Sequence, residues 1–233
     1  MKDDLLGQAR SLGFSLLGIA DPGLFQRYPR IRKPAEPDKY LQHPHEIWPD
    51  CRSVVVLGLH SREEVLDAIV RMDNLLGSFY WEIIRHREYR LRDWFRQQGY
   101  EAKITNDVSV KRAAVLAGLG QMGRNSLVAH PKHGSNLRFG LLLTDAEMAF
   151  DEPNDPLESA PCGDCRRCED VCPGGAISDY RVDFSRCIIP AADGWLSNDE
   201  EKIRKARRIQ QRGEVVEVEC NLCQKTCPLN KAG

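Results

Sequence analysis

The spacing of hydrophobic residues over the first 150 positions predicts mixed helical and strand structure. Residues 3–13 repeat apolar positions at the interval of a helix face. The runs at 15–20, 53–59 and 138–144 are apolar and rich in Val, Ile and Leu, which is typical of strands buried in a sheet. We therefore expect a layered α/β domain in this part of the chain.

The middle of the chain predicts helices separated by short turns. Residues 62–98 place apolar residues among charges at helical spacing, with a break near Gly77. A shorter helix is expected at about 109–117, followed by a Gly-rich turn and a strand at 126–130. Residues 21–50 are rich in proline and are expected to form an irregular surface loop.

The sequence changes character near residue 150. The stretch DEPNDPLESAP is acidic and contains proline, and the residues beyond it are organised around cysteines. We therefore expect two domains, residues 1–150 and residues 151–233. Within the second, Ser197 and Glu200 form a capping box that predicts a helix running to about Gln211.

The charge of the chain is balanced, with 33 Lys and Arg against 34 Asp and Glu over 233 residues. A formal net charge of −1 gives no reason to expect a polyanion or a membrane surface as the main partner. The first residues carry acids where a signal peptide needs bases, no twin-arginine signal appears, and no apolar run reaches the roughly 18–20 residues of a membrane span. We therefore expect a cytoplasmic protein with no membrane partner, whose clustered cysteines bind metal or take part in redox chemistry.

Eight of the nine cysteines follow the spacing of two-cluster ferredoxins. The run from Cys162 to Cys172 reads CxxCxxCxxxCP, a pattern in which the fourth cysteine ligates the other cluster. A crossed pattern needs a second group of cysteines, and Cys187 with the closing run from Cys220 to Cys227 supplies it. The expected ligands are Cys162, Cys165, Cys168 and Cys227 for one [4Fe–4S] cluster, and Cys172, Cys187, Cys220 and Cys223 for the other.

Other interpretations of the cysteines stay open. CxxC pairs also suit zinc, so a pair of zinc sites is the alternative, although the CxxCxxCxxxCP spacing favours iron–sulfur proteins. Cys51 stands alone before an apolar run and is expected to be a core or surface thiol.

Two further patterns suggest nucleotide or nucleic-acid binding. Residues 118–123 read GLGQMG and match the GxGxxG dinucleotide motif, but a helical segment precedes them and a strand follows, which reverses the required order. The predicted helix at 198–211 carries Lys and Arg residues that could contact RNA phosphates. A solvated surface helix with basic residues toward its C-terminus is the favoured interpretation of this segment.

Three stretches of the chain carry a resemblance to a known family. They are KRAAVLAGLGQMGRNSLVAHPKHGSNLRFGLLLTD at 111–145, CGDCRRCEDVCPGGAI at 162–177 and CNLCQKTCPLN at 220–230. Together they resemble the epoxyqueuosine reductases and their relatives, the reductive dehalogenases. The opening LLGQARSLGFSLLGIADP and the run SVVVLGL are similar to the first helix and strands of that family, so the resemblance covers nearly the whole chain.

The resemblance implies a fold and two kinds of cofactor. It implies an α/β (α+β) N-terminal domain similar to nitroreductases, which holds cobalamin without a protein histidine ligand, and a ferredoxin-like module whose two [4Fe–4S] clusters supply electrons to the cobalt. The sequence has no DxHxxG motif, which is consistent with that mode of binding. By position, the corrinoid pocket falls on Lys111, Gly118, Gly120, Arg124, Asn125, Ser126, Gly134, Ser135, Arg138 and Gly140. The alternative is that these are turn and core residues.

The chain departs from the family at the expected proton donor. In epoxyqueuosine reductases an acidic donor lies in a D-S-x-P stretch before the AGLG turn. Counting back that distance from Gly118 reaches Ile104, and only Asp107 is near. The aromatic-Gly-Asp-Tyr-His stretch of those enzymes is replaced by GSFYWEIIR. Asp107, Tyr80 and Tyr89 are therefore the candidate donors.

Three functions follow from these observations. The first is an iron–sulfur, cobalamin-dependent reductase that cleaves a carbon–oxygen or carbon–halogen bond through Co(I) and takes electrons from an unidentified low-potential donor. The second is a two-cluster electron-transfer protein that reduces a partner, such as a corrinoid protein, without bond chemistry of its own. The third is a reductase with tRNA as its partner.

Overall fold

The computed structural model describes residues 1–33, 36–60, 68–72, 75–155, 161–188, 211–212, 216–218 and 220–230. The chain forms two compact units. The sheet unit comprises Met1–His60, Ile83–Gln121 and Leu137–Ser159, and the cysteine unit comprises Ser61–Glu82, Met122–Asn136 and Ala160–Gly233. Both units contain segments from before residue 150, and the domain boundary placed there stays a prediction.

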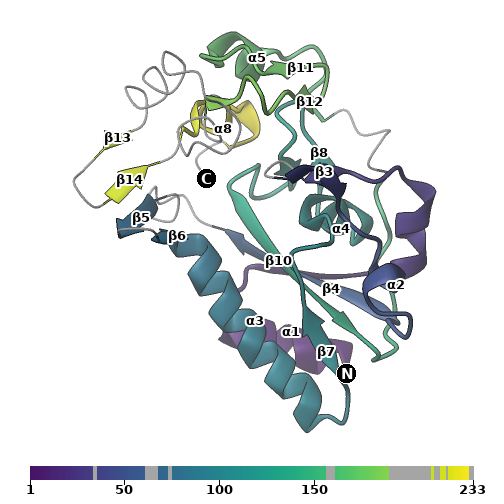
Figure 1. Ribbon diagram of the computed structural model, residues 1–233. Helices are drawn as coiled ribbons and strands as arrows, with labels where there is room; N and C mark the ends of the chain where they lie inside the picture. Colours follow the sequence, from purple (N-terminus) through teal and green to yellow (C-terminus); the bar gives the residue numbers. More distant parts are fainter. Residues whose placement is uncertain are drawn as a thin grey trace. The chain divides into compact units, whose positions relative to one another are not determined.

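A four-stranded antiparallel sheet forms the centre of the sheet unit (Figure 1). Its strands, in spatial order, are β1 (Leu16–Ala20), β4 (Ser53–His60), β10 (Leu137–Thr144) and β7 (Ala102–Ile104). β4 and β10 pair along their whole lengths, and seven of the eight residues of β4 are buried. The strands predicted at 15–20, 53–59 and 138–144 are thus confirmed, within a mixed α/β fold.

Helices cover both faces of this sheet. The helices of the sheet unit are α1 (Lys2–Ser11), α2 (Pro44–Ile47), α3 (Phe79–Gln97, from Ile83 onward) and α4 (Val110–Leu116), with a 3₁₀ turn η1 (Pro22–Arg27). Gly18 of β1 approaches Ala117 at the end of α4, whereas Gly140 of β10 approaches Ile84 of α3. The strand register puts these two glycines on opposite faces of the sheet, because Gly18 pairs with Val56 and Gly140 with Leu57.

The short strands of the cysteine unit join segments that are distant in sequence. Its elements are β5 (Ala68–Met72), β6 (Leu75–Ser78), β9 (Val128–Ala129), α5 (Arg167–Val171), β11 (Ile177–Ser178), β12 (Arg181–Val182), β13 (Gln211–Arg212), β14 (Val216–Val218), α8 (Leu222–Lys225) and a 3₁₀ turn η3 (Pro228–Asn230). One sheet has the order β13-β14-β5-β6, so residues near 70 pair with residues near 217. The strand β8 (Gln121–Met122) pairs with β9.

Two sequence predictions are wrong here. Beyond the break expected near Gly77, the helix predicted up to residue 98 is confirmed as α3 (Phe79–Gln97). Before the break the helix prediction is wrong, because Ala68–Met72 and Leu75–Ser78 form a β-hairpin, while residues 62–67 lie outside the described residues. The β-branched residues of this stretch find a strand partner in β14, and periodicity within a short window does not report such a distant pairing. The proline-rich stretch at 21–50 also contains short elements, including the paired strands β2 (Arg32–Lys33) and β3 (Glu36–Tyr40).

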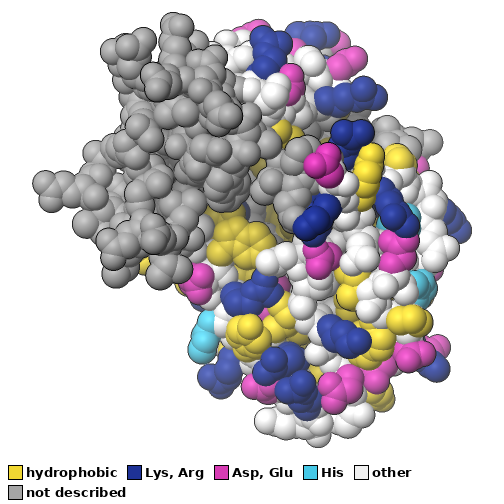
Figure 2. Space-filling view, viewed as in Figure 1, with side chains coloured by type: hydrophobic (Ala, Val, Ile, Leu, Met, Phe, Trp, Pro, Cys, Tyr) yellow, Lys and Arg dark blue, Asp and Glu magenta, His cyan; other side chains and the backbone are white. Residues whose placement is uncertain are grey.

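Two other predictions concern the outer surface of the chain. Within the part of the chain that the structure describes, no helix has the length and apolar character needed to cross a membrane. Figure 2 shows Lys and Arg side chains interspersed with Asp and Glu on the face that it displays, in keeping with the balanced charge. The basic helix predicted at 198–211 falls almost wholly on 198–210, which lie outside the described residues.

Candidate metal centre

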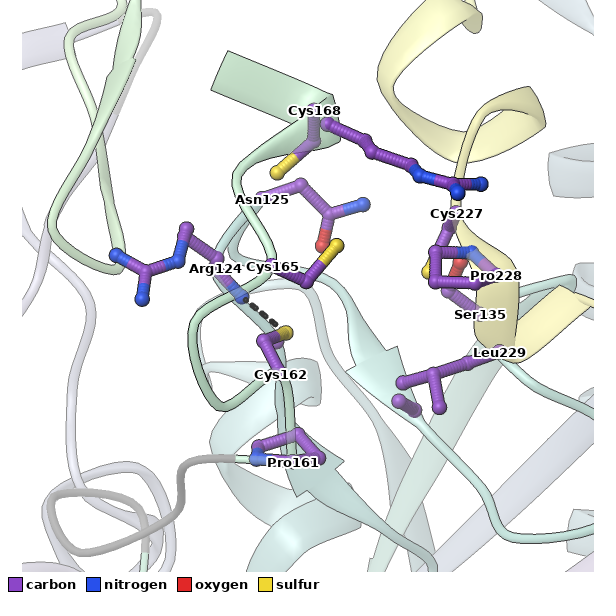
Figure 3. Close-up of a pocket in the computed structure, with 13 residues that line it drawn as sticks. Arg124, Asn125, Ser135, Pro161, Cys162, Cys165, Cys168, Cys227, Pro228 and Leu229 are labelled. Carbon is purple, nitrogen blue, oxygen red and sulfur yellow. Dashed lines mark hydrogen bonds between the residues drawn. The ribbon is translucent and has the colours of Figure 1, made fainter. Parts of the chain in front are cut away.

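Four cysteines surround one cavity in the cysteine unit (Figure 3). Cys162 and Cys165 lie on the loop that leads into α5, Cys168 lies in the first turn of α5, and Cys227 lies between α8 and η3. Apolar atoms of Ala129, Pro161, Pro228 and Leu229 form part of the cavity wall. These cysteines are the four that the crossed ferredoxin pattern assigns to one cluster, so two segments about 60 residues apart in sequence meet at this cavity.

Backbone geometry shapes the loop that carries the first three cysteines. The amide of Cys165 donates to the carbonyl of Cys162 at 3.0 Å and closes a tight turn. Gly163 inside this turn has a φ of +50°, which a glycine adopts without strain. The backbone amide of Arg124 donates to the Cys162 Sγ at 3.4 Å, the hydrogen bond drawn in Figure 3.

The segment that supplies Cys227 is fixed by a polar cluster around Ser135. The Asn230 Oδ1 accepts a hydrogen bond from the Ser135 amide at 2.5 Å, and its Nδ2 donates to the Gln224 carbonyl at 2.7 Å. The buried Gln224 side chain donates to the Ser135 carbonyl at 2.6 Å. Gly134 has a φ of +58°, and a Cβ added there would overlap Asn230 and the Leu229 carbonyl. The turn at 134–135 thus positions the last cluster ligand.

The other four cysteines also gather in the cysteine unit. Burial and then the negative charges of Cys220, Cys187, Cys172 and Cys168 together raise the pKa of the Cys223 thiol to about 12. Charges that affect one another in this way lie close together. The amide of Ala176 donates to the Cys172 Sγ at 3.3 Å, which is the kind of N–H to sulfur contact found around iron–sulfur clusters.

The electrostatics of both cysteine groups favour a bound cation. Burial and then the charge of Cys162 raise the pKa of the Cys168 thiol to about 11, so thiolates packed this closely repel one another in the bare protein. Iron supplies the positive charge that offsets this repulsion. The first cavity measures about 60 Å³, several times the roughly 10–15 Å³ that holds one water molecule.

A single zinc ion is the alternative occupant of these thiols, and zinc needs four sulfurs at about 2.3 Å from one centre. Among the described residues, no group of three or more His, Cys, Asp or Glu side chains has the arrangement of a single-metal site. The CxxCxxCxxxCP spacing in the sequence favours iron–sulfur clusters over zinc.

Five of the residues nominated for the corrinoid pocket contact the cysteine-bearing segments. Arg124 donates to Glu169 Oε1 at 3.2 Å and to the Gly163 carbonyl at 3.0 Å. Asn125 donates to the Cys223 carbonyl at 3.3 Å, and Ser126 donates to the carbonyl of Tyr180 at 3.1 Å. Gly134 and Ser135 hold the Cys227 segment.

The other nominated residues lie in the sheet unit. A Cβ added to Gly118 would approach the Glu152 carbonyl oxygen at 2.5 Å, and the Gly120 carbonyl accepts a hydrogen bond from Asn154. Gly140 packs against α3, so these three glycines make close protein contacts. Arg138 donates to the Leu137 carbonyl at 3.1 Å, and Lys111 is exposed. The corrinoid part of the prediction rests on the resemblance and stays a prediction.

The three candidate proton donors have separate surroundings. The Asp107 carboxylate contacts the Lys33 Nζ at 2.5 Å. Tyr89 is exposed and lies under the Arg92 guanidinium, while Tyr80 is half-buried beside Trp81. Tyr80 belongs to the cysteine unit and the other two to the sheet unit.

The sequence reading missed the polar residues that support the cysteines. These are Glu169, Tyr180, Gln224 and Asn230. Glu169 lies between Cys168 and Cys172, and Asn230 lies three residues after Cys227. Closeness in sequence to the cluster cysteines was therefore the signal that could have identified these two residues.

The cysteine-bearing residues match a known domain family. Residues 161–230 match the model of the 4Fe-4S double cluster binding domain, and all eight cysteines of the two predicted groups lie inside this match. Two [4Fe–4S] clusters are therefore supported for this part of the chain.

Comparison with known proteins extends the likeness to the rest of the chain. An epoxyqueuosine reductase from Synechococcus sp. (strain RCC307) is 34% identical over 161 residues, which cover 66% of this chain and 46% of the relative. The chain covers 64% of an epoxyqueuosine reductase from Bacillus subtilis (strain 168) and 79% of one from Atelocyanobacterium thalassa (isolate ALOHA), so it spans only part of the length of these relatives.

Solved structures share the fold. The epoxyqueuosine reductase from Streptococcus thermophilus has a TM-score of 0.70 at 20% identity, covering 99% of this chain and 66% of that one. A catabolic reductive dehalogenase has a TM-score of 0.61 at 21% identity, covering 98% of this chain and 31% of that one. The resemblance predicted from the sequence is therefore confirmed: this chain is similar to epoxyqueuosine reductases, and its residues 161–230 match the 4Fe-4S double cluster binding domain.

Proposed function

We propose that this chain is an iron–sulfur reductase whose two [4Fe–4S] clusters carry electrons one at a time. The observation that carries the proposal is the meeting of Cys162, Cys165, Cys168 and Cys227 around one cavity with partly apolar walls. We assign these four to one cluster, and Cys172, Cys187, Cys220 and Cys223 to the other. The charge of Cys168 acts on Cys223, which supports a short path between the two clusters.

The protein's own residues would hold the clusters and shield them from water. Cys168 is buried, and the backbone amides of Arg124 and Ala176 donate to ligand sulfurs. Such hydrogen bonds, together with burial, set the reduction potential of a cluster. The unidentified electron donor is a low-potential, one-electron carrier.

The finer proposal is a cobalamin-dependent reductase with a nitroreductase-like N-terminal domain. It is supported by the fold shared with reductive dehalogenases, one of which is described in terms of B12-dependent dehalogenation. A corrinoid would supply Co(I) chemistry for cleaving a carbon–oxygen or carbon–halogen bond. Asp107, Tyr80 and Tyr89 remain the proposed proton donors.

A tRNA is the substrate partner that this proposal favours. An epoxyqueuosine reductase solved with an epoxyqueuosine-modified tRNA-Tyr stem loop shares the fold, with a TM-score of 0.69 at 23% identity. Binding of tRNA to the full chain should weaken steeply as salt is added, because phosphate contacts release counterions.

The second candidate is an electron-transfer protein that reduces a partner, such as a corrinoid protein. Arg124, Asn125 and Ser126 favour it, because their hydrogen bonds go to the cysteine-bearing segments. The Lys33 contact of Asp107 also favours it, since this carboxylate is already paired.

Anaerobic reconstitution of the full chain with iron and sulfide tests the clusters. We expect about eight iron atoms per chain. The Cys165→Ser variant should lose about half of them, whereas Cys51→Ala, which changes a buried thiol outside both groups, should keep all eight. Zinc in place of iron, or equal iron in both variants, would refute the cluster assignment.

Cobalamin added to the reconstituted chain separates the two candidates. A cobalamin-dependent reductase should shift the corrinoid absorption bands and retain the cofactor through a desalting column. Full cluster content with all cobalamin recovered free would favour the electron-transfer protein.

A further inference from the structure

Three residues near Cys162 adopt an unfavourable backbone conformation. Among the described residues, the non-glycines with positive φ are Ser126 (57°), Asp179 (50°) and Tyr180 (63°). Each such residue costs about 1–2 kcal/mol relative to an ordinary conformation. All three belong to the cysteine unit, and the Ser126 hydroxyl donates to the Tyr180 carbonyl at 3.1 Å. Strain of this kind persists where the surrounding structure requires it, most often at functional sites.

The strained turn places an aromatic ring against a buried cation. Asp179 and Tyr180 form the two-residue connection between β11 and β12, and two positive φ values in a row are what a type I′ turn needs. The turn holds the Tyr180 ring 4.7 Å from the Arg124 guanidinium carbon. The side chain of Arg124 is only 7% exposed.

The Arg124 guanidinium is held in one position by its partners. Glu169 Oε1 accepts from its Nη1 at 3.2 Å, and the Gly163 carbonyl accepts from its Nη2 at 3.0 Å. The Asp179 carboxylate lies farther away, at 3.9 Å, and is largely exposed. These contacts anchor a positive charge to the loop that carries Cys162.

Arg124 also contacts a cluster ligand directly. Its backbone amide donates to the Cys162 Sγ at 3.4 Å, and the residue forms part of the cavity wall. Burial by itself lowers the pKa of Arg124, but the hydrogen bond and charge of Glu169, followed by the charges of Tyr180 and Cys162, raise it overall. The side chain therefore stays cationic, and its hydrogen bond to the Gly163 carbonyl holds this charge beside the residue that follows Cys162 in the chain.

From this arrangement we infer that Arg124, clamped by Glu169 and Tyr180, raises the reduction potential of the cluster held by Cys162, Cys165, Cys168 and Cys227. The inference rests on the proposed iron–sulfur function. In the reduction step the oxidised cluster takes one electron from a one-electron donor, no bond is made or broken, and the net charge of the cluster becomes more negative by one. A fixed positive charge nearby stabilises that product, and the carboxylate of Glu169 opposes it.

Redox titration of the reconstituted full chain, followed by electron paramagnetic resonance, tests the inference. Arg124→Gln should lower one of the two midpoint potentials and leave the other unchanged. We expect the equilibrium constant for reduction to fall about tenfold, which is about 59 mV for a one-electron couple. Arg124→Lys keeps the positive charge, so its midpoint potential should stay close to that of the wild type.

The opposite charge change provides the sharper control. Glu169→Gln removes the opposing carboxylate, so the same midpoint potential should rise. Arg166→Gln removes a guanidinium that also contacts Glu169 but is 61% exposed, and both potentials should stay near the wild-type values.

A purely structural role for Arg124 would give different results. Loss of packing would shift the midpoint potentials of Arg124→Gln and Glu169→Gln in the same direction, or would cause both variants to lose iron. Either result would overturn the inference. If only Arg124→Gln loses its cluster, the midpoint potential of Glu169→Gln decides between the two roles. A rise supports the inference, and a fall or no change overturns it. A wild-type chain without two clusters would refute the proposed function instead.

Discussion

The sheet unit buries large apolar side chains, whereas the described residues of the cysteine unit bury mostly small ones. In the sheet unit the fully buried side chains include Leu57, Leu141, Leu142, Ile84 and Phe95. In the cysteine unit the buried apolar residues that the structure describes are Ala68, Val128, Ala129, Cys168, Ala176, Ile177 and Ile188. A small apolar core contributes little free energy, so metal ligation and hydrogen bonds between distant segments must hold the cysteine unit together.

Removal of iron should show the largest difference in stability between the two units. Because loss of iron breaks the bonds that join the cysteine-bearing segments, we expect chelation under oxidising conditions to remove nearly all amide protection from α5 and α8. Protection of β4 and β10 should change little. Hydrogen exchange followed by mass spectrometry measures both units in one sample.

Reconstitution with iron and sulfide is the control for this experiment. Protection of α5 and α8 should return, which excludes chemical damage as the cause of its loss. Equal loss of protection in β4 and β10 would show that the sheet unit also depends on the clusters.

Addition of one methyl group at Gly134 should test the contacts that position Cys227. Gly134→Ala places a Cβ against Asn230 and the Leu229 carbonyl at a left-handed φ. We expect it to cost roughly 2–4 kcal/mol in the segment that carries Cys227 and to reduce the iron content toward four atoms per chain. Iron analysis after reconstitution measures the effect.

Gly163→Ala is the matched control for Gly134→Ala. Gly163 has a similar φ of +50°, but nothing lies within 4 Å of an added Cβ. It should cost only the backbone strain of about 1 kcal/mol and keep both clusters. Equal iron loss in the two variants would show that φ alone, and not the contact with Asn230, is responsible.

The same contrast explains how much of the molecule could be predicted from the sequence. The strands β1, β4 and β10 and the helices α1 and α4 are encoded by apolar residues that lie close together in sequence, so periodicity finds them. The cluster motif is also local, since three of its cysteines lie within seven residues. Local signals were sufficient in both cases.

Features that depend on distant segments were not predictable in this way. β5 was read as helix because its partner, β14, lies about 150 residues away. The partners of the Arg124 guanidinium, Glu169 and Gly163, lie about 40 residues further along the chain, and no pattern in the sequence indicates this pairing. Glu88 was not singled out, since one acid on a charged helix gives no sign that it will be buried.

Glu88 is a buried acid within the mainly apolar core of the sheet unit. Its side chain is 3% exposed and packs on β10 beside Gly140, where an added Cβ would overlap it. β7 pairs with β10 only from Leu142 onward, and Glu88 Oε1 accepts the Leu141 amide at 2.9 Å where that strand has ended. The carboxylate therefore completes the hydrogen bonding of a central strand.

Substitution of Glu88 should make the stability of the sheet unit less dependent on pH. Burial raises the pKa of Glu88 to about 7, although Arg85 and the Leu141 amide partly offset this effect. The native state then holds a proton that the unfolded state releases near its ordinary pKa of about 4.3, so stability falls as pH rises from about 4 to 7 and levels off above that. Glu88→Gln keeps the acceptor and removes the ionisation. We expect the variant to match the wild type near pH 4 and to exceed it by roughly 1–3 kcal/mol at pH 8.

The apparent melting temperature of the anaerobic, cluster-loaded chain measures this effect when wild type and variant are scanned at one rate between pH 4 and pH 8. Because Arg85 lies 3.1 Å from Glu88 Oε2, the variant also loses an ion pair, which lowers its advantage at high pH. Glu101→Gln is the control, since that side chain is 63% exposed on the same unit and its removal should shift the melting temperature little at any pH. A constant difference between wild type and Glu88→Gln across the whole range would mean that Glu88 stays ionised in its buried site, and that Arg85 and the Leu141 amide are sufficient to hold a charge there.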